Sequence, residues 1–438
     1  MEKHNLKPRI VIVGGGAGGM ELATRLGHCL GKKNRANIYL IDHQLTHVWK
    51  PLLHEVAVGT LDSHQDAINY VSHAHQHHYH FILGKMTGIE RSEKTITLAE
   101  ILDENQQRLV AQRTVRYDEL VIAVGSQANT FNVPGAEQHC YFLDSRPEAD
   151  AFHSTLINKI IQMRQPHPQS QPQSLNIAII GAGASGVELA AELVTALHQI
   201  ENINLEQDRP AWLCKITLIE ANKRILPALN QRLSEQVHYE LSQLGVQILT
   251  QQRVTRISAT EITTAAGLNI AATLKIGVAG IKAPSWLSSL DGLTTNSLHQ
   301  LEVRPTLQTT EDNHIFALGD CCACPLTDNT QVPPRAQSAN QQATLLCQSI
   351  QRQLKGKSLL EFKYNDRGSL IHLSGANSVG SLMGEFSQTF HIQGKIARLL
   401  YWLLYKIHQY NIHGIKKVIF LSIGASINKR VKPRLKLH

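Results

Sequence analysis

The chain has 438 residues, of which 42% are apolar and 18% charged, and this globular composition predicts two or three domains. Its seven cysteines are scattered and odd in number, which excludes a disulfide scaffold and favours a reducing compartment. The N-terminal residues are polar, and no stretch reaches the roughly 18 uncharged apolar residues of a spanning helix. We therefore expect neither a cleaved signal segment nor a transmembrane helix.

The net charge of +8 is unevenly distributed. Residues 395–438 contain ten Lys or Arg and no acidic residue, whereas the preceding chain has 33 basic and 35 acidic residues and is nearly neutral. A basic tail of this kind is typical of a segment that binds nucleic acid or an anionic membrane.

Residues 9–42 predict a strand, a glycine turn, a helix and a second strand. The turn has the G-x-G-x-x-G pattern that binds a dinucleotide pyrophosphate where a strand leads into a helix. The first glycine permits the tight turn, the second lets the backbone approach phosphate, and the third lets helix and strand pack closely. These glycines are Gly14, Gly16 and Gly19, and Asp42, 23 residues later, ends the second strand as a ribose acceptor.

The same order recurs over residues 176–220, which predicts an internal duplication of the βαβ unit. Glu220 takes the place of Asp42, and a carboxylate there favours NADH over NADPH because it repels a 2′-phosphate. It lies 34 residues after the last glycine, so we expect the insert at 199–213 to extend the helix and loop. Lys223 and Arg224 leave some NADPH tolerance open. The repeated glycines are Gly181, Gly183 and Gly186.

Other segments predict single elements. Residues 117–125 predict a strand that ends at Gly125, residues 314–320 a strand that ends at Gly319 and Asp320, and residues 335–354 a helix. The Pro/Gln-rich residues 164–174 predict a loop, and residues 369–393 predict strands. The histidine-rich run His73–His80 is interpreted as a solvated polar turn, and binding of a divalent metal ion stays open as the alternative. Cys321–Cys324 contains C-x-x-C but lacks a second ligand pair, so we expect neither zinc nor thiol chemistry there.

The tail predicts an amphipathic helix over residues 395–410. Basic side chains and aromatic residues flank its apolar face, and a second apolar patch follows at 418–424. A nucleic-acid arm has no need of this face, so we expect peripheral attachment to an anionic membrane and no nucleic-acid binding. The apolar face consists of Ile396, Leu399, Leu400, Leu403, Leu404 and Ile407.

The two glycine patterns, the strand that ends at Gly125 and the Gly319–Asp320 pair resemble flavoproteins with two dinucleotide-binding domains. Residues 50–60, 181–193, 333–341, 367–370, 379–384 and 434–438 resemble the proteobacterial type II NADH dehydrogenases, which are single-subunit NADH:quinone oxidoreductases that pump no protons. The resemblance implies an α/β fold with two Rossmann-like domains and a C-terminal membrane-anchoring region. The implied parts are an FAD-binding domain at 1–145, an NADH-binding domain at 146–300, the returning FAD-binding segment at 301–365 and a membrane-attachment region at 366–438.

The resemblance also implies residue roles. Glu188 faces the flavin–nicotinamide junction, whereas the residues alone make it a first-turn helix carboxylate. Gln337 and Gln341 line the quinone site, although alone they are surface glutamines that share a helix face. Asp320 binds FAD, although alone it is a possible helix cap. The implied FAD ligands are Gly14, Gly16, Gly19, Asp42, Lys50, Gly125, Gly319 and Asp320, and the implied NADH ligands are Gly181, Gly183, Gly186, Glu220 and Gly280.

The implied activity is hydride transfer from NADH to FAD and two-electron reduction of membrane quinone. The implied location is the cytoplasmic face of the bacterial inner membrane, and the implied assembly is a homodimer. Two alternatives stay open at this point. The first is a different flavoprotein of the same fold, such as a sulfide:quinone oxidoreductase or a ferredoxin or rubredoxin reductase. The second is a non-catalytic membrane protein that senses NADH.

Overall fold

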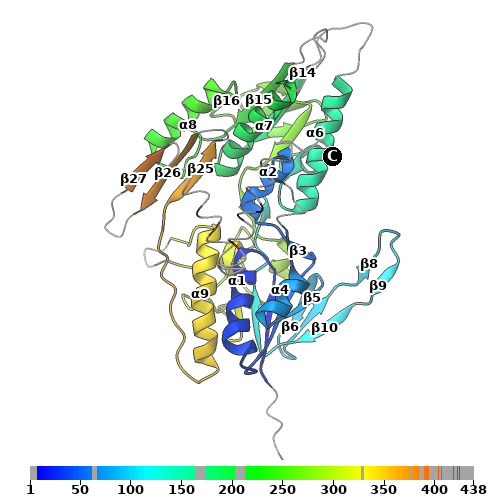
Figure 1. The fold of residues 1–438 in the computed structure, drawn as a ribbon, viewed down its shortest axis with the longest axis vertical. Coiled ribbons are helices and arrows are strands. Elements are labelled where there is room, and N and C mark those ends of the chain that lie inside the picture. The colour runs from blue at the N-terminus through cyan, green and yellow to red at the C-terminus, as the bar shows by residue number, and fades with distance from the viewer. Residues whose placement is uncertain are drawn as a thin grey trace, which may run out of the picture. The chain divides into compact units, whose positions relative to one another are not determined.

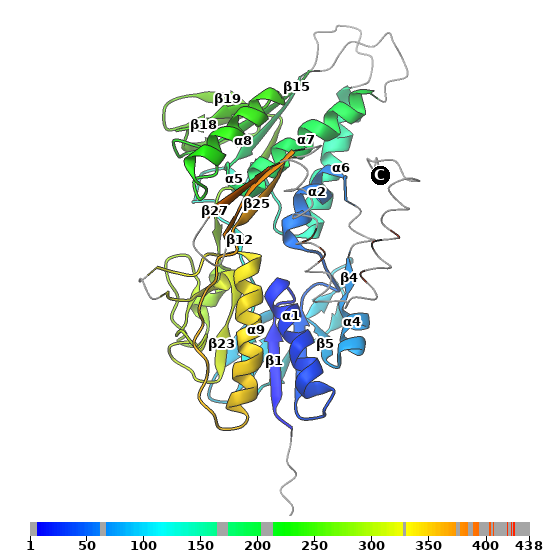
Figure 2. The same cartoon turned by 60° about the vertical axis from the view of Figure 1, so that its left-hand side comes forward.

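The structure is a computed structural model, and it divides the chain into two compact units (Figures 1 and 2). The first unit comprises Met1–Trp49, Ala67–Gln127 and Lys282–Asn365, and the second comprises Lys50–Asp66, Ala128–Ile281 and Asp366–His438. Lys50–Asp66, which the sequence assigned to the FAD-binding part, groups with the second unit. The residues described are 7–61, 67–163, 174–202, 213–326, 330–373, 377–383, 389–393, 403, 406, 418, 422 and 424.

The first unit contains a five-stranded parallel sheet with the strand order β23-β11-β1-β2-β5. Ile10, Val11 and Ile12 of the central strand β1 are completely buried. Continuous apolar runs of this kind are expected in a parallel sheet that is covered on both faces. The strands are β23 (Ile315–Ala317), β11 (Glu119–Ile122), β1 (Arg9–Val13), β2 (Asn37–Asp42) and β5 (His80–Leu83).

Helices α1 (Ala17–Leu26) and α9 (Ala336–Gln353) of the first unit lie side by side (Figures 1 and 2). A π-helical turn, η1 (Gly27–Gly31), continues α1. An antiparallel sheet of β6, β7 and β10 comes between β5 and β11 in the sequence. Its strands and the remaining elements are β6 (Met86–Glu90), β7 (Thr95–Leu98), β10 (Arg113–Arg116), β8 (Ile101–Leu102), β9 (Arg108–Val110), β3 (Thr46–His47), β4 (Ile68–Asn69), α4 (Tyr70–His77), η3 (Ser285–Ser289), β22 (Leu301–Glu302), η4 (Gly319–Cys321) and β24 (Cys322–Ala323).

The second unit repeats this arrangement. Its parallel sheet has the order β13-β20-β14-β15-β16, so that β14 takes the central place of β1. The antiparallel sheet of β17, β18 and β19 comes between β16 and β20 in the sequence, just as the sheet of β6, β7 and β10 comes between β5 and β11. The duplication therefore extends beyond the βαβ unit. The strands are β13 (Tyr141–Phe142), β14 (Ser174–Ile180), β15 (Leu213–Ile219), β16 (Gln247–Leu249), β17 (Val254–Ile257), β18 (Glu261–Thr264), β19 (Asn269–Ala271) and β20 (Leu274–Gly277).

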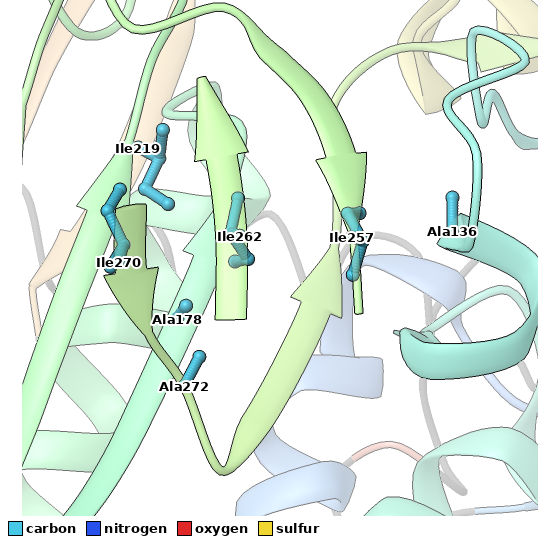
Figure 3. Packing of buried hydrophobic residues seen from close by; sticks show 7 residues of the cluster. All are labelled: Ala136, Ala178, Ile219, Ile257, Ile262, Ile270 and Ala272. Atoms are coloured by element: carbon cyan, nitrogen blue, oxygen red, sulfur yellow. The ribbon is translucent and has the colours of Figure 1, made fainter. Parts of the chain in front are cut away.

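One hydrophobic cluster joins the parallel sheet of the second unit to the sheet of β17, β18 and β19 (Figure 3). Ile219 and Ala178 come from the parallel sheet, whereas Ile257, Ile262 and Ile270 come from the antiparallel sheet. Burial of an isoleucine contributes roughly 1.5–3 kcal/mol relative to exposure, so this cluster holds the antiparallel sheet in place. Ala136 and Ala272 complete the cluster.

Helices α2, α6 and α7 of the second unit pack together, and strand β25 packs against α7. β25 belongs to a three-stranded antiparallel sheet with β26 and β27. The elements are η2 (Lys50–Leu52), α2 (Leu53–Val58), α5 (Ala136–His139), α6 (Arg146–Met163), α7 (Ala184–Asn202), α8 (Gln231–Gln243), β25 (Ser369–Leu373), β26 (Asn377–Met383) and β27 (Thr389–Gln393), with β12 (Gln127–Ala128) and β21 (Ile281–Lys282) where the chain crosses between the units.

The predicted strands near 117–125 and 314–320, the helix near 335–354 and the strands within 369–393 are confirmed by β11, β23, α9 and β25–β27. Helix α7 extends to Asn202, and residues 203–212 of the predicted insert lie outside the described residues. The predicted amphipathic helix at 395–410 and the patch at 418–424 lie outside them as well, apart from five single positions.

The prediction of a solvated turn at His73–His80 is wrong for residues 73–77. Helix α4 covers residues 70–77, and the Asn69 side chain caps it by accepting a hydrogen bond from the Ser72 N–H. His73 is buried, with its Nδ1 2.9 Å from the Tyr79 hydroxyl and its ring stacked on His77. The helix was not predicted because histidine counts as a polar residue, so the run lacks the apolar spacing of an amphipathic helix. A histidine ring can nevertheless be buried once a hydroxyl satisfies its hydrogen-bonding nitrogen.

Candidate functional site

The first glycine turn connects β1 to α1. Gly14 has a φ of +105°, and a Cβ there would lie 2.4 Å from the Ala123 carbonyl oxygen. A Cβ at Gly19 would lie 1.9 Å from the Gly14 carbonyl oxygen, whereas a Cβ at Gly16 would meet no atom within 4 Å. The first and third glycines are therefore required by the packing of the chain itself. The second borders open space at the N-terminus of α1, where an anion is favoured.

Asp42 turns its carboxylate back onto this turn. It accepts hydrogen bonds from the N–H groups of Gly15 at 2.6 Å and Gln44 at 2.8 Å. The Tyr70 hydroxyl also supports the turn, because it donates to the Gly15 carbonyl at 2.7 Å and its ring stacks on Phe81. Burial raises the pKa of Tyr70 well above its usual range, so this donor stays neutral.

Gly125 and Gly319 follow the adjacent parallel strands β11 and β23, both with positive φ. The carboxyl ends of parallel strands meet at one edge of a sheet, which is where nucleotides bind in folds of this kind. Here the Ser126 hydroxyl donates to the Asp320 carboxylate at 2.8 Å. The side-chain oxygen of buried Gln342 accepts the Gly319 N–H at 2.7 Å and thereby holds the loop against α9.

Asp320 does not cap the short helix η4, because Leu318 occupies the capping position and Asp320 lies within the helix. Its carboxylate therefore lies at the carboxyl edge of the sheet together with the first glycine turn. Seven of the eight FAD candidates, all except Lys50, belong to the first unit.

The second glycine turn, between β14 and α7, reproduces the first. Gly181 has a φ of +108°, and a Cβ there would lie 2.6 Å from Ala279 Cα. A Cβ at Gly186 would lie 2.0 Å from the Gly181 carbonyl oxygen, and a Cβ at Gly183 would again meet no atom within 4 Å. The second turn therefore offers the same open space at a helix N-terminus.

Glu220 supports this turn as Asp42 supports the first. It accepts hydrogen bonds from the Ala182 N–H at 2.9 Å and from the backbone and side-chain N–H groups of Asn222 at 2.9 and 2.7 Å. Gly280 has a φ of +69°, and a Cβ there would lie 2.7 Å from the Phe131 ring. Gly280 therefore leaves room for Phe131 beside the turn.

Glu188 is buried on α7 and accepts a hydrogen bond from the backbone N–H of His372 in β25 at 3.0 Å. Burial raises the pKa of Glu188 to about 8, and the nearby carboxylates of Glu55 and Glu192 add to this effect against the His372 hydrogen bond. The carboxyl is therefore largely protonated at neutral pH. A buried acid with a pKa near neutrality is suited to proton transfer.

His54 on α2 belongs to the same polar cluster in the second unit. Burial lowers the pKa of His54 to about 4, although the Glu192 carboxylate opposes the shift. The imidazole is therefore neutral at pH 7, and the cluster combines a neutral acid with a neutral base. Its members on α2, α7 and β25 are His54, Glu55, Glu188, Glu192 and His372.

Gln337 and Gln341 both lie on α9, as predicted, and both are half-buried. The Gln341 amide is engaged at both ends, because it donates to the Asn365 carbonyl at 2.8 Å and accepts the Asn365 N–H at 3.0 Å. Lys50 groups with the second unit, where its ammonium pairs with the Asp144 carboxylate at 2.9 Å.

The C-x-x-C segment is buried. Burial raises the pKa of Cys321 to about 11 and that of Cys324 to about 12, and it raises the pKa of Cys322 well above its usual value. Thiols of this kind are poor nucleophiles at neutral pH. In the part of the chain that the structure describes, no group of three or more His, Cys, Asp or Glu side chains is arranged to hold a metal ion. No helix among the described residues is long and apolar enough to cross a bilayer.

Comparison with known proteins agrees with this geometry. Residues 8–343 match the pyridine nucleotide-disulphide oxidoreductase family. The chain is also 39% identical to a type II NADH:quinone oxidoreductase of Haemophilus influenzae, over 98% of this chain and 99% of that protein. The chain therefore belongs to the pyridine nucleotide-disulphide oxidoreductase family and, within it, to the type II NADH:quinone oxidoreductases.

Two solved structures show the same fold. The NDH2 of Plasmodium falciparum in complex with NADH has a TM-score of 0.82 at 19% identity, and the match covers 98% of this chain and all of that one. The sulfide:quinone oxidoreductase of Aquifex aeolicus has a TM-score of 0.71 at 17% identity, with 95% of each chain covered. The predicted α/β fold with two dinucleotide-binding domains is thereby confirmed.

Sequence reasoning missed several residues that shape these sites. Tyr70, Ser126 and Gln342 carry no motif, and their roles depend on contacts with distant parts of the chain. Two features of the sequence point to the polar cluster. Glu192 follows Glu188 by four residues and so shares its helix face, and His54 lies within the segment 50–60 on which the resemblance rested.

Proposed function

We propose that the protein oxidises NADH and reduces a membrane quinone to quinol with FAD as its bound cofactor. The observation that supports this most strongly is the repeated glycine turn, in which each copy has open space at its second glycine and a carboxylate behind it. Two turns of this kind suit two dinucleotides. The 39% identity to a type II NADH:quinone oxidoreductase over nearly the whole chain supports the choice of substrates.

In this proposal the first unit holds FAD. The turn at Gly16 would bind its pyrophosphate, Asp42 its adenosine ribose, and Gly319 with Asp320 the opposite end of the molecule. Bound FAD supplies the two-electron chemistry. The second unit would hold NADH in the same way, through the turn at Gly183 and through Glu220.

Glu188 would hold the proton that accompanies electron transfer. Its Oε1 accepts the His372 N–H, so its proton sits on Oε2 when the carboxyl is neutral. Burial keeps this proton in place up to about pH 8. The other members of the polar cluster would then restore it after each turnover. Gln337 and Gln341 would contact the quinone, and the two hydrogen bonds of Gln341 to Asn365 would fix the orientation of its amide.

We further propose that the basic tail attaches the protein to the cytoplasmic face of the inner membrane and that the protein is a homodimer. The support for membrane attachment is the composition of residues 395–438, with ten basic side chains, no acidic ones and leucines at helical spacing. The homodimer rests on the resemblance to the type II NADH dehydrogenases alone. Removal of residues 394–438 should leave a flavoprotein that no longer sediments with anionic vesicles. Continued vesicle binding by the shortened chain would contradict the tail assignment.

The activity is tested with purified full-length protein, several electron donors and a soluble quinone. We expect rapid quinone reduction with NADH, slower reduction with NADPH, and none with sulfide. A preference for sulfide would favour the sulfide:quinone alternative, and rapid reduction of ferredoxin or rubredoxin without quinone reduction would favour a reductase of that kind. Colourless protein that binds NADH without turnover would favour the sensor.

A further inference from the structure

A pair of thiols lies outside the residues assigned to cofactor binding, within the first unit. Cys29 belongs to η1 and Cys347 to α9, 318 positions later, and their Sγ atoms are 3.5 Å apart. We propose that this pair is a peroxide-reactive site, at which Cys29 attacks the oxidant and Cys347 then forms a disulfide with it. The proposal does not depend on the proposed function.

The surroundings of the two sulfurs assign different roles to them. Cys29 is half-buried and therefore reachable, whereas Cys347 is buried. The hydrogen bond from Cys347 lowers the pKa of Cys29, and the positive charges of Lys33 and Arg25 act in the same direction, against burial. A thiolate is the reactive form of cysteine, so Cys29 is the better nucleophile of the two.

Cys347 has the properties of a resolving thiol. Its hydrogen bond to Cys29 and its burial raise the pKa of Cys347, so the pair carries its negative charge on the more exposed sulfur. The Gln351 amide donates toward the Cys347 sulfur at 3.5 Å and would stabilise a thiolate there. Once Cys29 is oxidised, the main cause of the raised Cys347 pKa is lost, and the second step becomes easier.

The chemistry balances with a hydroperoxide as the two-electron oxidant. The Cys29 thiolate attacks one peroxide oxygen, the S–O bond forms, the O–O bond breaks, and hydroxide leaves as water after it takes up a proton. Cys347 then attacks the sulfur of the Cys29 sulfenic acid, the S–S bond forms, and the S–O bond breaks with release of a second water. Two thiols have then lost two electrons and two protons, and one hydrogen peroxide has become two waters.

The packing of α1 against α9 makes closure feasible. The sulfurs must approach from 3.5 Å to about 2 Å, which a change of side-chain rotamer can supply between two helices that are already in contact. The disulfide would join the end of the α1–η1 segment to α9.

The test uses the full-length protein with its bound cofactor and graded hydrogen peroxide. After alkylation, mass spectrometry should detect one intramolecular Cys29–Cys347 disulfide that dithiothreitol reverses. Cys140 is the internal reference, because it is also half-buried but burial raises its pKa to about 11. We expect Cys29 to react at least about ten times faster than Cys140.

Three variants separate the roles. Cys347→Ser should leave Cys29 as a sulfenic acid that dimedone traps, and Cys140→Ser should form the disulfide as the native chain does. Cys29→Ser should leave Cys347 unreactive because burial still shields its thiol from the peroxide. Circular dichroism before treatment checks that each variant is folded. The proposal is overturned if folded native protein forms no such disulfide, if Cys140 reacts as fast as Cys29, or if Cys347 still reacts in Cys29→Ser.

Discussion

The two glycine turns share one backbone plan, and the helices that follow them differ in the residue four positions after a buried glutamate. Two residues beyond the third glycine stand Glu21 in the first unit and Glu188 in the second, and both are buried. Four residues further on, Arg25 pairs with Glu21 at 2.8 Å, whereas the second unit has Glu192 at the corresponding position. The same helix position therefore holds a compensated carboxylate in one unit and an uncompensated one in the other.

This difference shows how one copy of a repeated fold gains a carboxyl group that titrates near neutral pH. Burial raises the pKa of Glu21, but Arg25 opposes the shift through a hydrogen bond and its charge. Burial also raises the pKa of Glu188, to about 8, and there the neighbouring carboxylates reinforce the shift. In our proposal each glycine turn binds a dinucleotide. The residue one helical turn further on then makes the glutamate an ion-pair partner in the first unit and a proton carrier in the second.

The largest effect is expected from Glu188→Gln, which removes the titrating proton but keeps the side-chain shape. Turnover should fall by at least about a hundredfold, because a positioned proton donor contributes that much. In the native protein turnover should decrease as the pH rises through about 8, and this limb should be absent in the variant. Steady-state rates from pH 6 to 10 measure both.

The matched control is Glu21→Gln, which changes the corresponding carboxylate of the first unit. It breaks the ion pair with Arg25 and should cost stability while turnover keeps its pH limb. Equal losses of turnover in both variants would mean that Glu188 has no special role.

The same carboxyl makes a prediction about stability. The folded-state pKa of Glu188 is about 8, above the ordinary value of 4.5, so its stabilising contribution is complete below pH 4.5 and is lost as the pH rises through 8. Glu188→Gln should therefore gain in melting temperature relative to the native protein as the pH increases from 5 to 9. A difference that stays constant over this range would show that Glu188 ionises normally.

The second glycines of the two turns test whether the first turn binds FAD and the second binds NADH. Neither position restricts a Cβ, and Gly16 has a φ of −64° that alanine adopts easily, so Gly16→Ala and Gly183→Ala should both fold. Gly16→Ala should lower flavin affinity by about tenfold or more, which corresponds to about 1.4 kcal/mol. Gly183→Ala should keep its flavin and raise the KM for NADH. The measurements are the flavin content and the NADH kinetics of the two variants. A loss of flavin from Gly183→Ala would reverse the assignment of the two turns.

A smaller effect should follow from Glu192→Gln. The substitution removes one of the negative charges that raise the pKa of Glu188, so the pH limb should move to lower pH while the maximal rate changes little. Glu55→Gln should shift it in the same direction. If the decrease in turnover at high pH stays in place in both variants, it reports the titration of a group other than Glu188.

The smallest effect concerns the choice of nucleotide. Glu220→Gln removes the charge that would repel a 2′-phosphate, yet the side chain can still accept the Ala182 N–H. The ratio of kcat/KM for NADH to that for NADPH should fall several-fold. An unchanged ratio would show that Glu220 supports the turn without selecting the nucleotide.

The sequence predicted what depends on local spacing and missed what depends on distant contacts. The glycines, Asp42 and Glu220 are separated by distances that one βαβ unit fixes, so their places followed from the pattern. Gln342 meets Gly319, and Tyr70 meets Gly15, only after the sheet has assembled. Helix α4 was not predicted because its buried face includes His73, and a histidine counts as polar in a sequence pattern. The place of Lys50–Asp66 in the second unit depends on packing against α6 and α7, which no local motif reveals.

The most direct measurement follows the flavin absorbance when purified protein is mixed anaerobically with NADH and then with quinone. We predict that one NADH per flavin removes the visible absorbance and that quinone restores it. Protein that contains no flavin and cannot be reconstituted with it, or flavin whose absorbance NADH leaves unchanged, would contradict the assignment of the two turns to two dinucleotides that exchange electrons.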